Sequence, residues 1–142
     1  HDVRKKMEDI LVEELTPVLC VGETLTERET GQAEEVVEIQ LRGAFDNLSW
    51  PKGKEMIIAY EPVWAIGTGQ SCGPEEAQRM HLFARKLVKN LVPSADTIIL
   101  YGGSVRANNI KDFLSCKDID GALVGGASAK LDSWMEIVNN AN

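Results

Sequence analysis

The chain has 142 residues, of which 44% are hydrophobic and 26% charged, and this composition excludes a disordered or fibrous protein. Its 15 Lys and Arg against 22 Asp and Glu give a formal net charge of −7, and because no basic stripe interrupts this acidic balance, we expect no nucleic-acid partner. No apolar run approaches the ~18 residues of a membrane-spanning helix and the first residues lack the apolar stretch of a signal peptide, so we expect a cytoplasmic protein with no membrane partner and one domain over residues 1–142.

Helical and strand-like segments alternate along the chain. Apolar residues spaced three and four apart form stripes that are typical of amphipathic helices, and four short apolar runs are typical of buried strands. In chain order we expect a helix over 3–15, a strand over 17–21, a helix over 33–48, a strand over 56–60, a helix over 74–91, a strand over 97–101, a short helix over 110–114, a strand over 122–124 and a closing helix over 131–138.

The four strand-like runs do not alternate polar and apolar residues, which is typical of parallel strands covered on both faces. Their starts at 17, 56, 97 and 122 lie 39, 41 and 25 residues apart, which suits strand–helix units with right-handed crossovers. The fold class is therefore α/β, with four parallel strands and flanking helices. Two closures stay open: a doubly wound open sheet, or part of a (β/α)8 barrel of typically ~250 residues. Because the chain opens on a helix, we expect a piece of something longer.

The residues that follow the four strands point to an anion site. Function in either architecture lies at the carboxyl ends of parallel strands, where this sequence has Gly22-Glu23, Glu61-Pro62, Gly102-Gly103-Ser104 and Gly125-Gly126-Ala127-Ser128. Glycine lets backbone N–H groups approach an anion closely, and a helix that begins just beyond adds partial positive charge. The last two segments therefore favour a phosphate cradle, although a glycine after a strand also occurs in plain tight turns. The absence of GxxxxGK[ST] and GxGxxG argues against the common nucleotide cradles.

The connection over residues 62–73 is long for a strand–helix loop, which usually has about 2 to 6 residues. It begins with the stiff apolar segment Pro62-Val63-Trp64 and continues with Gly67-Thr68-Gly69, a composition that suits a lid swinging on small residues. Under such a lid Glu61 would become a stronger base, since desolvation disfavours the carboxylate charge. The plainer interpretation is a surface loop with Trp64 against the core and a structural salt bridge at Glu61.

The three cysteines, Cys20, Cys72 and Cys116, are far apart and form no CxxC pair. Their odd number and their spacing argue against a disulfide scaffold and against a zinc site. We therefore expect a reducing compartment and no metal.

Four ordered motifs resemble the triosephosphate isomerase family. The stretch from Ala59 to Gly69, AYEPVWAIGTG, is similar to the family's catalytic-glutamate strand and its lid loop. The other three are CVGE and TERETG within residues 20–31, YGGSV in 101–105 and LVGGAS in 123–128. Together they cover nearly all of the chain in the family's order. Because the (β/α)8 barrel, or TIM barrel, takes its name from this family, the resemblance implies the C-terminal half of a barrel, with strands five to eight.

The resemblance also implies a reaction and a set of site residues. The family interconverts dihydroxyacetone phosphate and D-glyceraldehyde 3-phosphate, a step of glycolysis and gluconeogenesis, through an enediolate and without a cofactor or a metal. By this resemblance Glu61 is the catalytic base that moves the proton between the two carbons. The residues that hold the substrate phosphate with backbone N–H groups are Gly67, Ser104, Gly125 and Gly126.

The sequence departs from the family's pattern in several places. The family mechanism also needs a lysine and an asparagine after the first strand and a histidine after the fourth, and none of these can be found here. His1 has no strand before it, and His81 lies on the apolar stripe of a predicted helix, which favours packing. Gln70 stands where the family often has a basic residue. We interpret Cys20 as a small core thiol and Glu23 as a carboxylate that supports loops.

We therefore expect the isolated 142 residues to be catalytically feeble, because an enediolate without its electrophile lacks the largest stabilising contribution. A half barrel exposes two edge strands and one apolar face, so we expect self-association, aggregation or completion by the N-terminal half, and a homodimer once complete. Two alternatives stay open: a non-catalytic phosphate-binding half-barrel module, and another barrel enzyme with a shared phosphate site. The presence of Glu61 beside an intact lid sequence favours the isomerase.

Overall fold

The computed structural model describes residues 2–69 and 71–141, so the sequence expectations for His1 and Gln70 fall outside the described residues. The strands are β1 (Val18–Val21), β2 (Glu55–Tyr60), β3 (Asp96–Tyr101) and β4 (Gly121–Ala122). The α-helices are α1 (Asp2–Val12), α2 (Leu25–Glu29), α3 (Ala33–Phe45), α4 (Pro74–Leu91), α5 (Ile110–Leu114) and α6 (Leu131–Ala141). Two short 3-10 helices are η1 (Val63–Ala65) and η2 (Gly126–Ala129).

The strands form one parallel sheet in the order β1-β2-β3-β4, so each strand pairs with the next strand in the chain. A doubly wound sheet reverses its strand order at a switch point, and the described sheet has no such reversal. The order is that of consecutive strands in a (β/α)8 barrel. The predicted α/β class, with four parallel strands and flanking helices, is confirmed as part of such a barrel.

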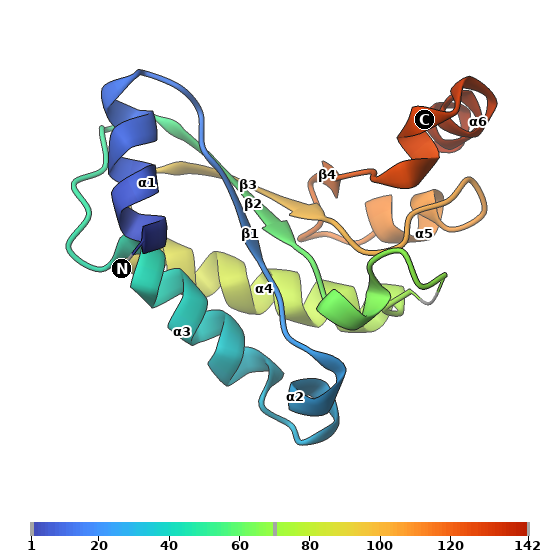
Figure 1. Cartoon of the computed structure of the whole chain (residues 1–142), viewed down its shortest axis with the longest axis horizontal. Helices are drawn as coiled ribbons and strands as arrows, with labels where there is room; N and C mark the ends of the chain where they lie inside the picture. Colours follow the sequence, from blue (N-terminus) through green and yellow to red (C-terminus); the bar gives the residue numbers. More distant parts are fainter. Residues whose placement is uncertain (1, 70, 142) are drawn as a thin grey trace.

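One face of the sheet packs against α3 and α4, which lie side by side along it (Figure 1). The residues in register on this face are all buried: Leu19 with Ile58 and Ile99, and Val21 with Tyr60 and Tyr101. The two helices bury the apolar stripes that their spacing predicts, including Val37 and Leu41 on α3 and Ala77 and Met80 on α4. The hydrophobic core therefore lies between this face and the two helices.

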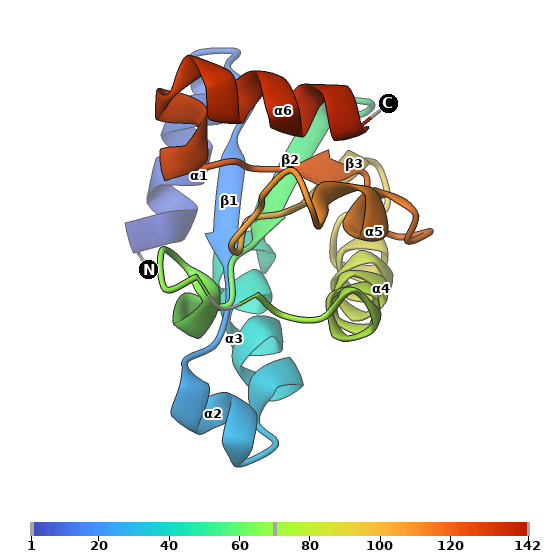
Figure 2. The same ribbon diagram turned by 90° about the vertical axis from the view of Figure 1, so that its right-hand side faces the viewer.

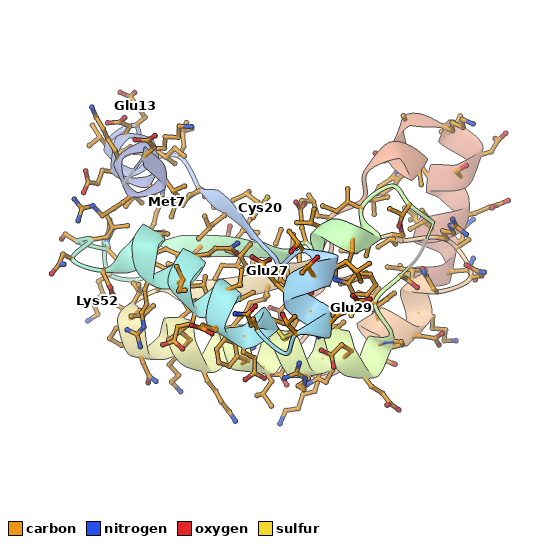
Figure 3. The ribbon with its side chains drawn as sticks, turned by 60° about the horizontal axis from the view of Figure 1, so that its bottom comes forward. Met7, Glu13, Cys20, Glu27, Glu29 and Lys52 are labelled. Atoms are coloured by element: carbon orange, nitrogen blue, oxygen red, sulfur yellow. The ribbon has the colours of Figure 1, made fainter. Side chains whose placement is uncertain are left out.

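The opposite face of the sheet is open along β1 in the described chain, whereas Ala59 on β2 is fully buried. Val18 is 49% exposed and Cys20 is exposed, and their register partners on this face are Ile57 and Ala59. In Figures 1 and 2, α1 and α6 lie away from this face's centre, α1 against α3 and α6 against α5 and η2. Coverage on both faces, which is typical of parallel strands, is therefore not complete in the described residues, and the exposed positions agree with the apolar face expected of a half barrel. Cys20, labelled in Figure 3, is correspondingly not a core residue, because its side chain projects from the open face.

The differences between predicted and observed elements fall at ends and in short segments. The helix predicted over 33–48 ends at Phe45, because Asn47 adopts a left-handed conformation with φ of 61°. Helix α2 was not predicted, since its five residues are too few to show a periodic stripe. It is instead stabilised at its start by a capping box between Thr24 and Glu27. None of the helices described is both long enough and apolar enough to cross a membrane.

Candidate active site

Glu61 follows β2 directly and is held between the ends of β1 and β3. Its backbone N–H donates to the carbonyl of Val21 at 2.7 Å, and the N–H of Gly102 donates to the carbonyl of Tyr60 at 2.8 Å. A Cβ on Gly22 would lie 1.9 Å from the Glu61 carbonyl oxygen, and a Cβ on Gly102 would lie 2.5 Å from Glu61 Cγ and 2.9 Å from Oε1. Both glycines are therefore required to place the carboxylate, a role that we did not assign to them from the sequence.

The Cys20 thiol lies beside the Glu61 carboxylate on the open face. Partial desolvation, and then the negative charge of Glu61 and a hydrogen bond to it, raise the pKa of the exposed Cys20 thiol above its ordinary value. The thiol therefore stays protonated near neutral pH, so that it is a neutral neighbour of the carboxylate.

A cleft of about 280 Å³ lies at the carboxyl ends of β3 and β4. All four residues predicted to hold a phosphate line it, together with Gly102, which the Glu61 side chain contacts. The lining residues come from three separate loops: Ile66, Gly67 and Gly69, then Gly102 to Arg106, then Gly125 to Ala127. The fold therefore gathers the predicted segments around one space, and Glu61, which does not line this space, lies beside Gly102 of its wall.

The loop over residues 62–73 is fastened to the end of β3 at two points. The Ser104 hydroxyl donates to the carbonyl of Ala65 at 2.6 Å, and the Tyr101 hydroxyl accepts from the N–H of Cys72 at 3.1 Å. Between these points Gly67 and Gly69 have φ of 68° and 80°, a left-handed region that favours glycine. The loop is therefore held at Ala65 and at Cys72, and Gly67 and Gly69 lie between these two points in conformations that favour glycine.

Comparison of the amino-acid sequence with those of known proteins shows the family of the chain. A sequence model described as "Triosephosphate isomerase" matches residues 1–141. This chain belongs to the triosephosphate isomerase family. The triosephosphate isomerase of Roseiflexus sp. is 49% identical over 140 residues, covering 96% of this chain and 55% of the relative. That of Chloroherpeton thalassium is 45% identical over 142 residues, covering 98% of this chain and 56% of the relative. The chain thus spans about half the length of the curated relatives it matches.

In this member of the triosephosphate isomerase family, Glu23 is fully buried and ties the lid to β2. Its carboxylate accepts hydrogen bonds from the Arg28 guanidinium at 2.7 Å, from the Tyr60 hydroxyl at 3.1 Å and from the Trp64 indole N–H at 2.9 Å. Arg28 also pairs with Glu76 at the start of α4. Burial, and then the Glu23 charge, raise the pKa of Tyr60. Glu23 therefore lies where a loop-supporting carboxylate is expected, whereas sequence reasoning assigned no role to Arg28 or Tyr60.

His81 is fully buried in α4, so the interpretation of this residue as a packing residue is confirmed. Its Nδ1 lies 2.7 Å from the Ala77 carbonyl oxygen, and its ring centroid lies 5.5 Å from that of Tyr60 and 6.3 Å from that of Tyr101. Burial lowers the pKa of His81, so its ring is neutral at pH 7. The ring thus packs near two tyrosines: Tyr101, whose hydroxyl accepts from the Cys72 N–H of the loop, and Tyr60, whose hydroxyl donates to Glu23.

The chemical groups gathered here are a carboxylate, a set of main-chain amides and one guanidinium. The described residues contain no group of three or more His, Cys, Asp or Glu side chains arranged to hold a metal ion. A carboxylate at the edge of an amide-lined cleft can transfer a proton to and from an anionic substrate bound in that cleft. The lysine and histidine that the family mechanism also needs are not among the residues that line the cleft.

Proposed function

We propose that this chain supplies the base and the phosphate cradle of a triosephosphate isomerase. The reaction is the interconversion of dihydroxyacetone phosphate and D-glyceraldehyde 3-phosphate through an enediolate, with no cofactor and no metal. The observation that carries the proposal is the position of Glu61 Oε1, 2.9 Å from where a Cβ on Gly102 would lie, since Gly102 lines the same cleft as Gly67, Ser104, Gly125 and Gly126. Family membership over residues 1–141 supports it.

In this proposal Glu61 removes a proton from the carbon next to the substrate carbonyl and returns it to the neighbouring carbon. Backbone N–H groups of Gly67, Ser104, Gly125 and Gly126 hold the phosphate, which fixes the reacting carbons against the carboxylate. Closing of the loop over residues 62–73 excludes water, which strengthens the base and protects the enediolate from losing its phosphate.

The remaining groups come from the N-terminal half of the barrel, on the same polypeptide or a separate one. The described sheet has four strands, an open apolar face and an edge strand at each end, β1 and β4. Four further strands would cover that face and supply the lysine and the histidine that stabilise the enediolate. We further propose a homodimer once the barrel is complete, by family resemblance, and a cytoplasmic location, which the three free cysteines support.

Steady-state isomerase assays test this proposal with the 142-residue chain alone and with the N-terminal four strands added. We expect turnover at least about 100-fold lower for the chain alone, because the charge-stabilising groups are absent, and recovery when they are supplied. Near-normal turnover by the chain alone would contradict the proposal that the charge-stabilising groups come from the N-terminal half of the barrel. A completed barrel that binds inorganic phosphate without turnover would instead support the non-catalytic phosphate-binding module.

A further inference from the structure

Among the described residues that line the proposed phosphate cleft, one side chain is charged. Its lining consists of glycines, apolar side chains, Ser104 and Arg106. Because the chain carries a formal net charge of −7, a dianionic substrate reaches the cleft against the field of the whole molecule unless a local cation offsets it. We propose that Arg106 binds the substrate phosphate together with the main-chain amides and sets the preference for phosphorylated over uncharged trioses. This inference rests on the proposed function.

Arg106 reaches from the β3 end of the cleft to the lid. Its Nη2 lies 2.9 Å from the position that a Cβ on Gly69 would occupy, so the guanidinium lies against the lid backbone at a residue whose φ is 80°. A phosphate between Gly67 and the glycines after β4 therefore lies within the space that Arg106 lines. A guanidinium is suited to this position because its planar N–H groups match two phosphate oxygens at once.

The loop that carries Arg106 is ordered by its own hydrogen bonds. The Arg106 backbone N–H donates to Asn109 Oδ1 at 2.7 Å, and Asn109 Nδ2 donates to the Ser104 carbonyl at 3.1 Å. One asparagine side chain thus closes a ring around residues 104–109. The Arg106 side chain is therefore presented from a fixed backbone, which lowers the entropy lost when it binds a ligand.

Arg106 differs from the other arginines in that none of the ion pairs of the described residues includes it. The other five each pair with at least one carboxylate: Arg4, Arg28, Arg42, Arg79 and Arg85. No ion pair within residues 2–69 and 71–141 includes Arg106, although Glu136 lines an adjoining hollow with it. In an acidic protein whose other arginines are all paired, the unpaired one lines the anion cleft.

The test compares Arg106→Gln, Arg106→Lys and the matched control Lys111→Gln in the complete barrel. Lys111 is an exposed residue of α5 outside the cleft, and its replacement removes the same unit of charge. We expect Arg106→Gln to weaken the binding of inorganic phosphate by about tenfold in calorimetry and to raise the KM of D-glyceraldehyde 3-phosphate by a similar factor, with kcat within about twofold. Arg106→Lys should recover part of the affinity, and Lys111→Gln should leave both quantities unchanged.

Equal phosphate affinity in Arg106→Gln and Lys111→Gln would overturn the inference, as would equal KM values. The two readouts also separate it from the proposed function. If the wild-type barrel has no isomerase activity but Arg106→Gln still weakens phosphate binding, the proposed function fails and the role of Arg106 stands. If the wild-type barrel isomerises the substrate but Arg106→Gln binds phosphate as tightly as the wild type, the proposed function stands and the role of Arg106 fails.

Discussion

At the scale of single residues, the position of Glu61 depends on two neighbouring glycines, because neither has a side chain to occupy the space that Glu61 fills. Gly22 and Gly102 flank it, and a Cβ at either position would overlap its backbone or its side chain. The sequence indicated the carboxylate and the phosphate-holding residues, because each stands directly after an apolar run or inside a recognisable motif. It could not indicate the role of these glycines, since that role depends on segments 39 and 41 residues away meeting at one sheet edge.

Replacing Gly102 by Ala should displace the Glu61 carboxylate, because the new Cβ would lie 2.5 Å from Glu61 Cγ. We expect kcat of the complete barrel to fall by about 100-fold, the effect of a displacement near 1 Å at a reacting group. Gly43→Ala on α3 is the control, since a Cβ there has no atom within 4 Å. Steady-state kinetics of the two variants measure the difference, and equal kcat values would show that Glu61 does not depend on Gly102.

At the scale of elements, the lid depends on a buried charge network and on neighbouring strands. Helices α3 and α4 were predictable, because their apolar stripes repeat over several turns. Helix α2 and the short helix η1 were not, because their stability comes from caps and from the contacts of Glu23 with Arg28 and Trp64. Such contacts join residues far apart in the sequence and leave no periodic signal.

Glu23→Gln should loosen this region, because Arg28 would lose the charge of a fully buried partner. We expect the free energy of unfolding to fall by about 3 kcal/mol, near the low end for a broken buried pair because Arg28 keeps Glu76. Urea unfolding of the complete barrel measures this, with Glu29→Gln on the exposed end of α2 as the control. The change of the acceptor beside the Trp64 indole from a carboxylate to a neutral amide should also shift the fluorescence of Trp64. A variant as stable as the control would show that the network contributes little.

At the scale of the whole molecule, the described residues build one covered face and one open face of a sheet. The parallel strands and their order follow from apolar runs that alternate with helical stripes. Which face stays open could not be read from those runs, since they are apolar on both sides, as strands of a closed barrel are. The exposed Val18 and Cys20 mark the uncovered part of this face.

The isolated chain should therefore associate with itself or aggregate in the absence of the complementary strands, because the edges of β1 and β4 and one apolar face are uncovered. Sedimentation velocity measures this, and species larger than the 15.6 kDa monomer are expected at micromolar concentrations. Addition of the N-terminal four strands should replace them with a defined complex. A stable monomer with cooperative unfolding would contradict this account of the open face.

The most direct test of the central claim is the turnover of Glu61→Gln in the complete barrel. The amide keeps the shape of the side chain but cannot accept the proton, so kcat should fall by at least about 1,000-fold. Binding of inorganic phosphate should be unchanged, because the cleft residues that hold it are intact. If Glu61→Gln instead keeps more than about a tenth of the wild-type kcat, with the general-base contribution thus supplied elsewhere, the assignment of Glu61 as the base is wrong.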